Sequence, residues 1–428
     1  MRPPILFLTV AFAAGLYAGL DLFVARAAWY VVLPVVGAAL LLARPAPLGA
    51  AVGIMAVAGM LWGKAAVQER EATCAGAWGR ETGNGKRETV AAAVRLLDPV
   101  SSPGGVVDAE VLPGTCGGAL RLRWPEDRPA RGGTNWAVAG RWSSEGGPGL
   151  LVVRRVRALD PVPRGRGALR DALAARSTEL FGARAAIVNA LVFAPNARLD
   201  SDIRERYVRS GLAHLLSISG LHVGFIAAWL ALILRKLPLA ARARFAATAV
   251  LLLGYLWLLG FPAPAVRAGA MLTLAEVGRL RERVVAPRGV VALAALGVLL
   301  QDPWALESVG AWLSVAGVGA VIWAGRAFAR APRLARLAAP ALAATLVTAP
   351  ISALAFGTVA PIGVLANLIA IPLARVAVPG LVLALALSWL ASGLAHPIAA
   401  GAGLGLALLD LVAQGAALVP GGHVVMVA

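Results

Sequence analysis

Apolar segments of near-membrane length dominate this chain and limit its fold more than any other feature of the sequence. They lie at 4–20, 28–43, 48–63, 215–234, 245–260, 266–277, 290–300, 309–323, 337–355, 362–373, 376–390 and 398–418. A bilayer core of about 30 Å needs about 20 apolar residues per helix. Only 14% of the 428 residues are charged, whereas soluble domains average about a quarter. We therefore predict a polytopic α-helical membrane protein with about 11–12 transmembrane or re-entrant helices.

Composition divides the chain into four regions. Residues 1–64 and 212–420 hold the apolar segments, although the first segment also has features of a signal peptide. Residues 65–164 contain no apolar run of membrane length, and short β-type runs between turn signals predict about five strands in a small OB-like barrel. Residues 165–211 are amphipathic and rich in arginine, which is typical of helices in the bilayer interface. We therefore expect one small β domain inserted between two membrane regions.

The charge of the connections predicts the orientation of the chain. Lys and Arg number 40 against 22 Asp and Glu, which suits both cytoplasmic loops and a polyanionic substrate. A neutral connection at 261–264 and an arginine-free one at 301–304 alternate with basic connections, which contain Arg235, Lys236, Arg242, Arg244, Arg279, Arg281, Arg283, Arg288, Arg326, Arg330, Arg333 and Arg336. Basic connections belong in the cytoplasm. This alternation predicts a multi-pass inner-membrane protein with a cytoplasmic N-terminus and an extracytoplasmic β domain.

Cys74 and Cys116, the two cysteines of the chain, both lie in the region predicted to be extracytoplasmic. Disulfides persist in oxidising compartments. We expect a Cys74–Cys116 disulfide, and two buried free thiols are the alternative. With so few cysteines and only four histidines, a cysteine-ligated metal site is not expected.

The segment 211–223 reads G-L-A-H-L-L-S-I-S-G-L-H-V and places polar groups at the start of an apolar helix. Such groups are costly there unless they face a cavity or another helix. The candidates for a channel lining are His214, Ser217, Ser219 and His222. The two histidines would lie about 12 Å apart along a continuous helix, too far to share a metal ion unless the helix breaks. Hydrogen bonding between helices explains the same residues.

Two further polar residues lie in or beside apolar segments. Arg267 follows the neutral connection, where its guanidinium can reach the membrane surface or contact a phosphate. Asn367 is flanked by apolar residues and followed by Pro372, which suits a kinked helix with inward-facing polar groups. A helix–helix hydrogen bond is an equally good explanation for Asn367. We predict that His222, Arg267 and Asn367 border one polar pathway.

The segment 211–223 resembles the signature of the ComEC family, the inner-membrane channel proteins for DNA uptake in competent bacteria. Further matches follow in the family's order at 266–271, at 302–304 with 310–314, and at 356–373. The resemblance extends to the whole chain, since the family has N-terminal helices, an extracytoplasmic OB-like insert and a competence membrane domain. It implies that the chain passes single-stranded DNA across the membrane during natural transformation.

The resemblance also implies partners and sets a limit on chemistry. Expected partners are single-stranded DNA, membrane lipids, a DNA receptor, a cytoplasmic helicase and a second copy of the chain. Longer family members carry a metallo-β-lactamase-like domain whose metal site needs a His-x-His-x-Asp-His run. No such run occurs in this sequence. We therefore expect no cofactor, no catalytic or metal-binding residue and no nuclease activity in this polypeptide.

The β region interleaves tryptophans with arginines, as surfaces that bind single strands do. The candidate DNA contacts are Arg121, Arg123, Trp124, Trp136 and Arg141. Tryptophans at strand spacing also fit a barrel core, and nearby acidic residues dilute the positive charge. Other functions share the general features of the chain: a secondary transporter or lipid-handling permease, or a scaffold of the uptake machinery.

Overall fold

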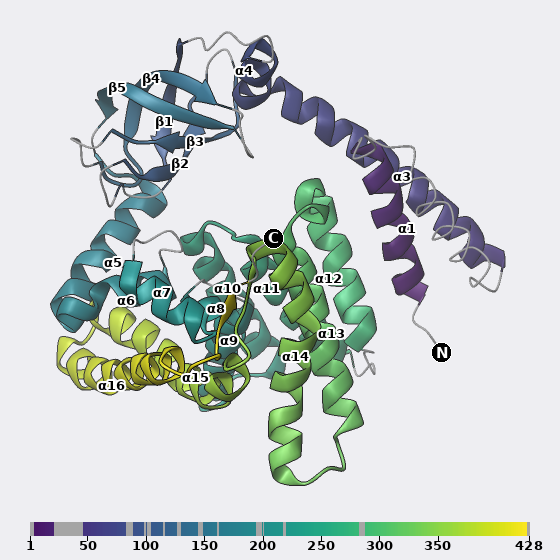
Figure 1. Cartoon of the computed structure of the whole chain (residues 1–428), viewed down its shortest axis with the longest axis vertical. Coiled ribbons are helices and arrows are strands. Elements are labelled where there is room, and N and C mark those ends of the chain that lie inside the picture. Colours follow the sequence, from purple (N-terminus) through teal and green to yellow (C-terminus); the bar gives the residue numbers. More distant parts are fainter. Residues whose placement is uncertain are drawn as a thin grey trace. The chain divides into compact units, whose positions relative to one another are not determined.

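The computed structural model describes residues 4–20, 46–82, 89–97, 100, 104–113, 116–125, 130–143, 149–160, 162–193, 199, 201–216, 220–281 and 287–425. The chain forms two compact units. One comprises Met1–Lys64 with Leu199–Ala428, and the other comprises Ala65–Arg198. We call the first the membrane unit and the second the barrel unit (Figure 1).

Five strands of the barrel unit close into a barrel with the order β1-β2-β3-β5-β4. The strands are β1 (Thr89–Leu96), β2 (Val106–Val111), β3 (Ala119–Arg123), β4 (Asn135–Ser143) and β5 (Leu150–Asp160). β3 and β5 pair in parallel, whereas the other neighbours are antiparallel. The small β domain inserted in a helical protein is therefore confirmed, and we describe it as OB-like on its strand order.

Alternation along the strands builds the barrel core. On β3, Leu120 and Leu122 point inward, whereas Arg121 and Arg123 are exposed. This period of two is the normal geometry of a strand with one buried face. The sequence pattern of apolar and charged residues is therefore sufficient to explain which face of β3 is buried.

Three helical segments accompany the barrel: α4 (Cys74–Thr82), α5 (Gly165–Phe181) and α6 (Ala185–Val192), with the short helix η2 (Gly182–Arg184) before α6. Gly167 on α5 packs directly against the backbone of Gly132 and Gly133, where a Cβ atom has no room. Arg170 on the same helix is buried, which lowers its pKa to about 10. The division between the units thus falls inside region 165–211, because α5 is bound to the barrel.

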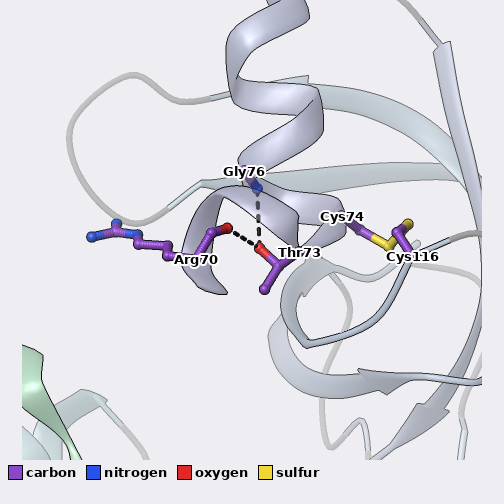
Figure 2. Close-up of a disulfide and its surroundings, with 5 residues drawn as sticks. All are labelled: Arg70, Thr73, Cys74, Gly76 and Cys116. Atoms are coloured by element: carbon purple, nitrogen blue, oxygen red, sulfur yellow. Dashed lines mark hydrogen bonds between the residues drawn. A yellow bond between two sulfur atoms is a disulfide. The ribbon is translucent and has the colours of Figure 1, made fainter. Parts of the chain in front are cut away.

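The N-terminus of α4 is covalently tied to the barrel. Figure 2 shows the Cys74–Cys116 disulfide, whose Cα atoms lie 5.2 Å apart. The Thr73 hydroxyl accepts a 3.2 Å hydrogen bond from the Gly76 N–H, as an N-cap residue does. Trp78 then packs edge-to-face on Trp142 with ring centroids 5.5 Å apart. The helix is therefore held by a cap, a disulfide and an aromatic contact.

The membrane unit consists mainly of helices. In chain order they are α1 (Pro4–Gly19), α3 (Ala46–Ala72, which runs into the barrel unit), α7 (Ser201–Arg209), α8 (Ala213–Leu216), α9 (Gly220–Leu234), α10 (Ala241–Leu259), α11 (Ala263–Leu280), α12 (Pro287–Gln301), η3 (Pro303–Leu306), α13 (Val309–Ala327), α14 (Arg333–Phe356), α15 (Gly363–Leu387) and α16 (Ser392–Ala417). The short strands β6 (Thr358–Val359) and β7 (Val424–Val425) pair with each other.

Six helices in the described part of the chain are long and apolar enough to cross a membrane. They are Ala51–Ala72, Ala241–Leu259, Val309–Ala327, Ala338–Ala355, Gly363–Leu387 and Ser392–Ala417, with shorter apolar helices at Pro4–Gly19, Gly220–Leu234 and Gly289–Gln301. This confirms the polytopic helical class. The predicted segment 28–43 lies outside the described residues.

The separation of segments 362–373 and 376–390 was wrong. Both belong to the single helix α15, which contains Pro372 and Pro379 in its interior. Proline removes one backbone hydrogen bond but is tolerated in membrane helices, where neighbouring groups compensate. The number of apolar segments counted from the sequence is therefore larger than the number of helices that they form.

Small residues bring the membrane helices close together. Ala366, Ala370, Ala374 and Ala377 repeat along one face of α15 and are buried in a core shared with α7, α9, α10 and α16. A Cβ built on Gly405 of α16 would lie 3.0 Å from the Cβ of Ala377. Small residues are favoured at membrane helix contacts because they let backbones approach. This core positions the polar residues of the motifs.

Candidate functional site

The histidine motif includes the end of α8 and the start of α9. α8 ends at Leu216 and α9 begins at Gly220. Ser217 and Ser219 lie outside the described residues. His222, in the first turn of α9, is 1% exposed, whereas His214 on α8 is exposed. The structure therefore buries His222 and leaves His214 exposed.

Gly211 joins this motif to the one at 356–373. It has a φ of +74°, a conformation that non-glycine residues rarely adopt. A Cβ atom at Gly211 would lie 2.7 Å from the Cα of Gly363, the first residue of α15. The turn before α8 and the start of α15 thus touch backbone to backbone.

Gly220 joins the same motif to the one at 266–271. A Cβ at Gly220 would lie 3.0 Å from the Cβ of Ala268 and 3.5 Å from the carbonyl oxygen of Pro264. The start of α9 therefore packs against the start of α11. A larger side chain at Gly220 would have to displace α11.

Arg267 joins the 266–271 motif to the one at 310–314. Its side chain is on α11 and the residue is 4% exposed. Nη2 donates to the carbonyl oxygen of Gly310 at 3.1 Å and to Oγ of Ser314 at 2.9 Å. Asp302 contributes a favourable charge interaction. The three junctions together connect all four sequence motifs in one packed assembly.

Asn367 is buried on α15 in an apolar environment and is 9% exposed. Its Oδ1 has no hydrogen-bond partner among the residues that the structure describes, and the same holds for Nε of Arg267. A buried acceptor without a partner costs about 1–3 kcal/mol. Packing alone does not explain an amide at this position, since an apolar residue of similar size would avoid the cost.

The cavity that Arg267 lines does not contain the other two pathway candidates. It has a volume of about 700 Å³ and apolar walls from α1, α12 and α13. His222 and Asn367 do not line this cavity, and their common pathway with Arg267 stays a prediction. The bonds of Arg267 to α13 identify it first as a group that positions two helices.

In the barrel unit, the candidate contact Trp124 is a core residue. It is 1% exposed and packs edge-to-face on Trp136 with centroids 5.3 Å apart. Trp136 is half-buried and donates from Nε1 to Oγ1 of Thr134 at 2.7 Å. The prediction that Trp124 contacts DNA is therefore corrected, because no face of its ring is open to a base.

The arginine candidates of the barrel unit lie on two different faces. Arg121 and Arg123 are exposed on β3, with Nε of Arg121 4.0 Å from Oδ1 of Asp108. Arg141 is half-buried on β4. Charge on the β3 face is thus partly balanced by Asp108.

Sequence reasoning missed a more basic face formed by β1, β4 and β5. Arg155 and Arg157 of β5 are exposed opposite Ala139 and Ala137 of β4, and Arg95 is exposed on β1. The next outward positions on β1 are Thr89, Ala91 and Ala93, paired with Arg141, Ala139 and Ala137. The two arginines at alternate positions of β5 were a usable signal. The register shift between Ala139 and Gly140 determines which way these two arginine side chains face, and it could not be predicted from the sequence.

No group of three or more His, Cys, Asp or Glu residues with metal-site geometry occurs within the described ranges. The four packed motifs and the apolar helices define a membrane protein whose motifs are joined by close glycine contacts and by one buried arginine. Residues 191–428 match the competence protein family, and the chain belongs to that family.

Three relatives match parts of this chain. The competence protein ComA of Neisseria gonorrhoeae is 40% identical over 147 residues, 32% of this chain and 21% of ComA. The ComE operon protein 3 of Bacillus subtilis (strain 168) is 28% identical over 187 residues, 44% of this chain and 24% of the relative. The uncharacterized protein YcaI of Escherichia coli (strain K12) is 28% identical over 214 residues, 46% of this chain and 28% of YcaI.

The chain thus aligns with less than a third of the length of each of these relatives. No solved structure matches the chain.

Proposed function

We propose that this chain forms the membrane conduit through which single-stranded DNA reaches the cytoplasm during natural transformation. The main support is the packed assembly of the four motifs, all of which lie within the segment matched by the competence protein family. Glycine contacts and the Arg267 bonds hold this assembly together. The names of ComA and the ComE operon protein 3 favour a competence role for the shared segment.

The polar residues within the assembly favour a hydrophilic solute. His222, Arg267 and Asn367 are each buried in helices of an apolar unit, where ionisable and amide groups usually mark a transport path. The formal net charge of +18 favours a polyanion over a neutral or cationic solute. A single DNA strand combines both properties.

The orientation belongs to the same proposal. The basic connections of the membrane unit lie on the cytoplasmic side, and the barrel unit lies outside, where DNA arrives. A DNA receptor would deliver the strand and a cytoplasmic helicase would draw it in, with a second copy of the chain as a further partner. The proposal assigns translocation to this chain and assigns it no cleavage of DNA.

A deletion strain provides the test. Restoring the wild-type gene should restore transformation with an antibiotic-resistance marker, whereas a Gly211→Leu variant should not, because its side chain would collide with Gly363. The control is Gly254→Leu, since a Cβ at Gly254 meets no atom within 4 Å. Full transformation without the gene would reject the proposal and favour a secondary transporter or lipid-handling permease.

A further inference from the structure

A cleft with three arginines lies between α9, α10 and α11 of the membrane unit. Arg235 directly follows α9, Arg244 lies in the first turn of α10, and Arg279 lies in the last turn of α11. Because the short connections reverse the chain direction twice, these three positions come to the same end of the helices. All three line one cavity of about 290 Å³.

Away from the arginines, the walls of this arginine cleft are mostly apolar, with Thr248 and Thr273 as polar lining residues, and the α9 wall is made of small residues. α9 contributes Gly224, Ala227, Ala228 and Ala231, and Leu252 and Leu272 close the other sides. Glu276 is the acidic lining residue, and its Oε2 lies 3.4 Å from Nη1 of Arg279. Three guanidinium groups against one carboxylate leave the mouth of the cleft positively charged. The cleft therefore combines a cationic mouth with an apolar interior.

We propose that the arginine cleft binds an anionic phospholipid, with the headgroup phosphate at the three arginines and the start of an acyl chain along the small residues of α9. Basic pockets between transmembrane helices are suited to anionic headgroups, because each nearby Lys or Arg attracts the phosphate. The apolar wall favours a lipid over a free phosphate ion, which would gain nothing from it. This site is separate from the buried motifs and does not depend on the proposed DNA function.

A simpler role of Arg235 and Arg279, stabilisation of helix ends, makes different predictions. Arg235 and Arg279 lie at helix C-termini, where a cation complements the helix dipole. That effect gives no preference among lipids and no sensitivity to the volume of the cleft. The test must therefore vary the lipid charge, the arginines and the cleft volume separately.

The test measures the thermal stability of the full chain in a neutral detergent, with either phosphatidylglycerol or phosphatidylcholine added. Wild type should gain Tm with phosphatidylglycerol and much less with phosphatidylcholine. In the Arg235→Ala/Arg244→Ala/Arg279→Ala variant, half-saturation should need at least about tenfold more phosphatidylglycerol than in wild type. The matched control, Arg330→Ala/Arg333→Ala/Arg336→Ala, removes the same charge from exposed positions in the α13–α14 connection and the first turn of α14, and it should respond like wild type.

A second pair of variants tests the volume of the cleft without changing charge. A Cβ at Gly224 meets nothing within 4 Å, so Gly224→Leu extends into the cleft without a clash. It should weaken the phosphatidylglycerol response while leaving the lipid-free Tm near that of wild type, and this result decides the matter if the triple variant folds poorly. Gly254→Leu, on α10 outside the cleft lining, is the control.

Two results would overturn the lipid assignment. One is an equal response to phosphatidylglycerol in wild type, the triple variant and Gly224→Leu. The other is displacement of phosphatidylglycerol by a short single-stranded oligonucleotide in wild type, together with loss of oligonucleotide binding in the triple variant. That second result would assign the arginine cleft to the DNA strand. Neither depends on transformation, so a failure of the lipid site is distinguishable from a failure of the DNA conduit.

Discussion

The guanidinium of Arg267 donates a 2.9 Å hydrogen bond to the hydroxyl of Ser314, 47 positions further along the chain. The same nitrogen also donates to the carbonyl oxygen of Gly310 at 3.1 Å. One buried cation thereby ties the start of α11 to the start of α13. The contact explains why an arginine is retained in an otherwise apolar environment, since its charge is shared with two acceptors and with the nearby carboxylate of Asp302.

This contact predicts a measurable coupling between Arg267 and Ser314. A hydrogen bond to a charged group contributes about 1.5–3 kcal/mol. Ser314→Ala should lower the free energy of unfolding by about that amount in wild type and by much less in an Arg267→Ala background. A double-mutant cycle in detergent measures the difference. Ser308→Ala is the control, because the Ser308 side chain makes no capping hydrogen bond to α13. Equal effects of Ser314→Ala in both backgrounds would show that the hydrogen bond contributes nothing.

Tyr207 on α7 should make the membrane unit sensitive to alkaline pH. Burial raises the pKa of Tyr207, and the carboxylate of Asp410 raises it further, whereas Arg206 lowers it. Because the pKa of Tyr207 is higher in the folded than in the unfolded protein, Tyr207 contributes its full stabilisation below the unfolded-state pKa of about 10. That stabilisation is lost as the pH rises beyond this value.

Melting curves from neutral pH to above pH 10 test this sensitivity. The Tm of wild type should fall more steeply above about pH 10 than that of Tyr207→Phe. The control Tyr17→Phe removes a tyrosine hydroxyl from α1 instead of α7. Identical alkaline profiles for wild type and Tyr207→Phe would contradict the predicted role of Tyr207.

The Cys74–Cys116 disulfide should stabilise the barrel unit. The two cysteines are 42 positions apart, and closing a loop of this length lowers the entropy of the unfolded chain. This loss raises the free energy of the unfolded state by about 4 kcal/mol. Cys74→Ser/Cys116→Ser should lower the unfolding free energy of the barrel unit by about 3–4 kcal/mol, and a reductant should have the same effect on wild type only. Non-reducing mass spectrometry of protein recovered from membranes should find no free thiols. Two free thiols would contradict the disulfide.

The basic face of β5 should contribute more to binding a single DNA strand than the β3 face does. Arg155→Ala/Arg157→Ala should weaken binding to the full chain and reduce its salt dependence by about 0.7 in slope for each phosphate that the variant no longer neutralises. Arg121→Ala/Arg123→Ala should have a smaller effect, since Asp108 lies beside Arg121. The control Arg176→Ala/Arg184→Ala removes the same charge from exposed positions on α5 and η2. Equal losses of affinity in all three variants would mean that net charge, rather than the β5 face, attracts the strand.

Local patterns predicted the elements of this fold well, whereas contacts between distant segments were out of reach. The alternation of leucine and arginine on β3 identified its buried face, and apolar length identified the membrane helices. The Gly211–Gly363 and Arg267–Ser314 contacts join segments far apart in sequence, and no local periodicity encodes such pairs. Trp124 was ambiguous because a tryptophan in a strand fits a core as well as a binding surface. The register shift beside Gly140 likewise depends on pairing between strands.

Asn367 offers a test in which function and packing predict opposite results. Its Oδ1 is buried without a partner among the described residues, so Asn367→Leu should leave stability unchanged or raise it. If the amide borders the path of the strand, the same change should reduce DNA import. A structural amide would instead lose stability when replaced. The control Gln301→Leu removes an amide from an exposed position at the end of α12.

Import of a labelled single strand into the cytoplasm tests the proposed conduit most directly. The assay compares the deletion strain restored with wild type, Asn367→Leu or Gln301→Leu, and normalises cytoplasmic label to surface-bound DNA and to the amount of protein in the membrane. Wild type and Gln301→Leu should import the strand, the deletion strain should bind DNA without importing it, and Asn367→Leu should import several-fold less than wild type. Import by the deletion strain at the wild-type rate would contradict the proposal that this chain carries the DNA across the membrane.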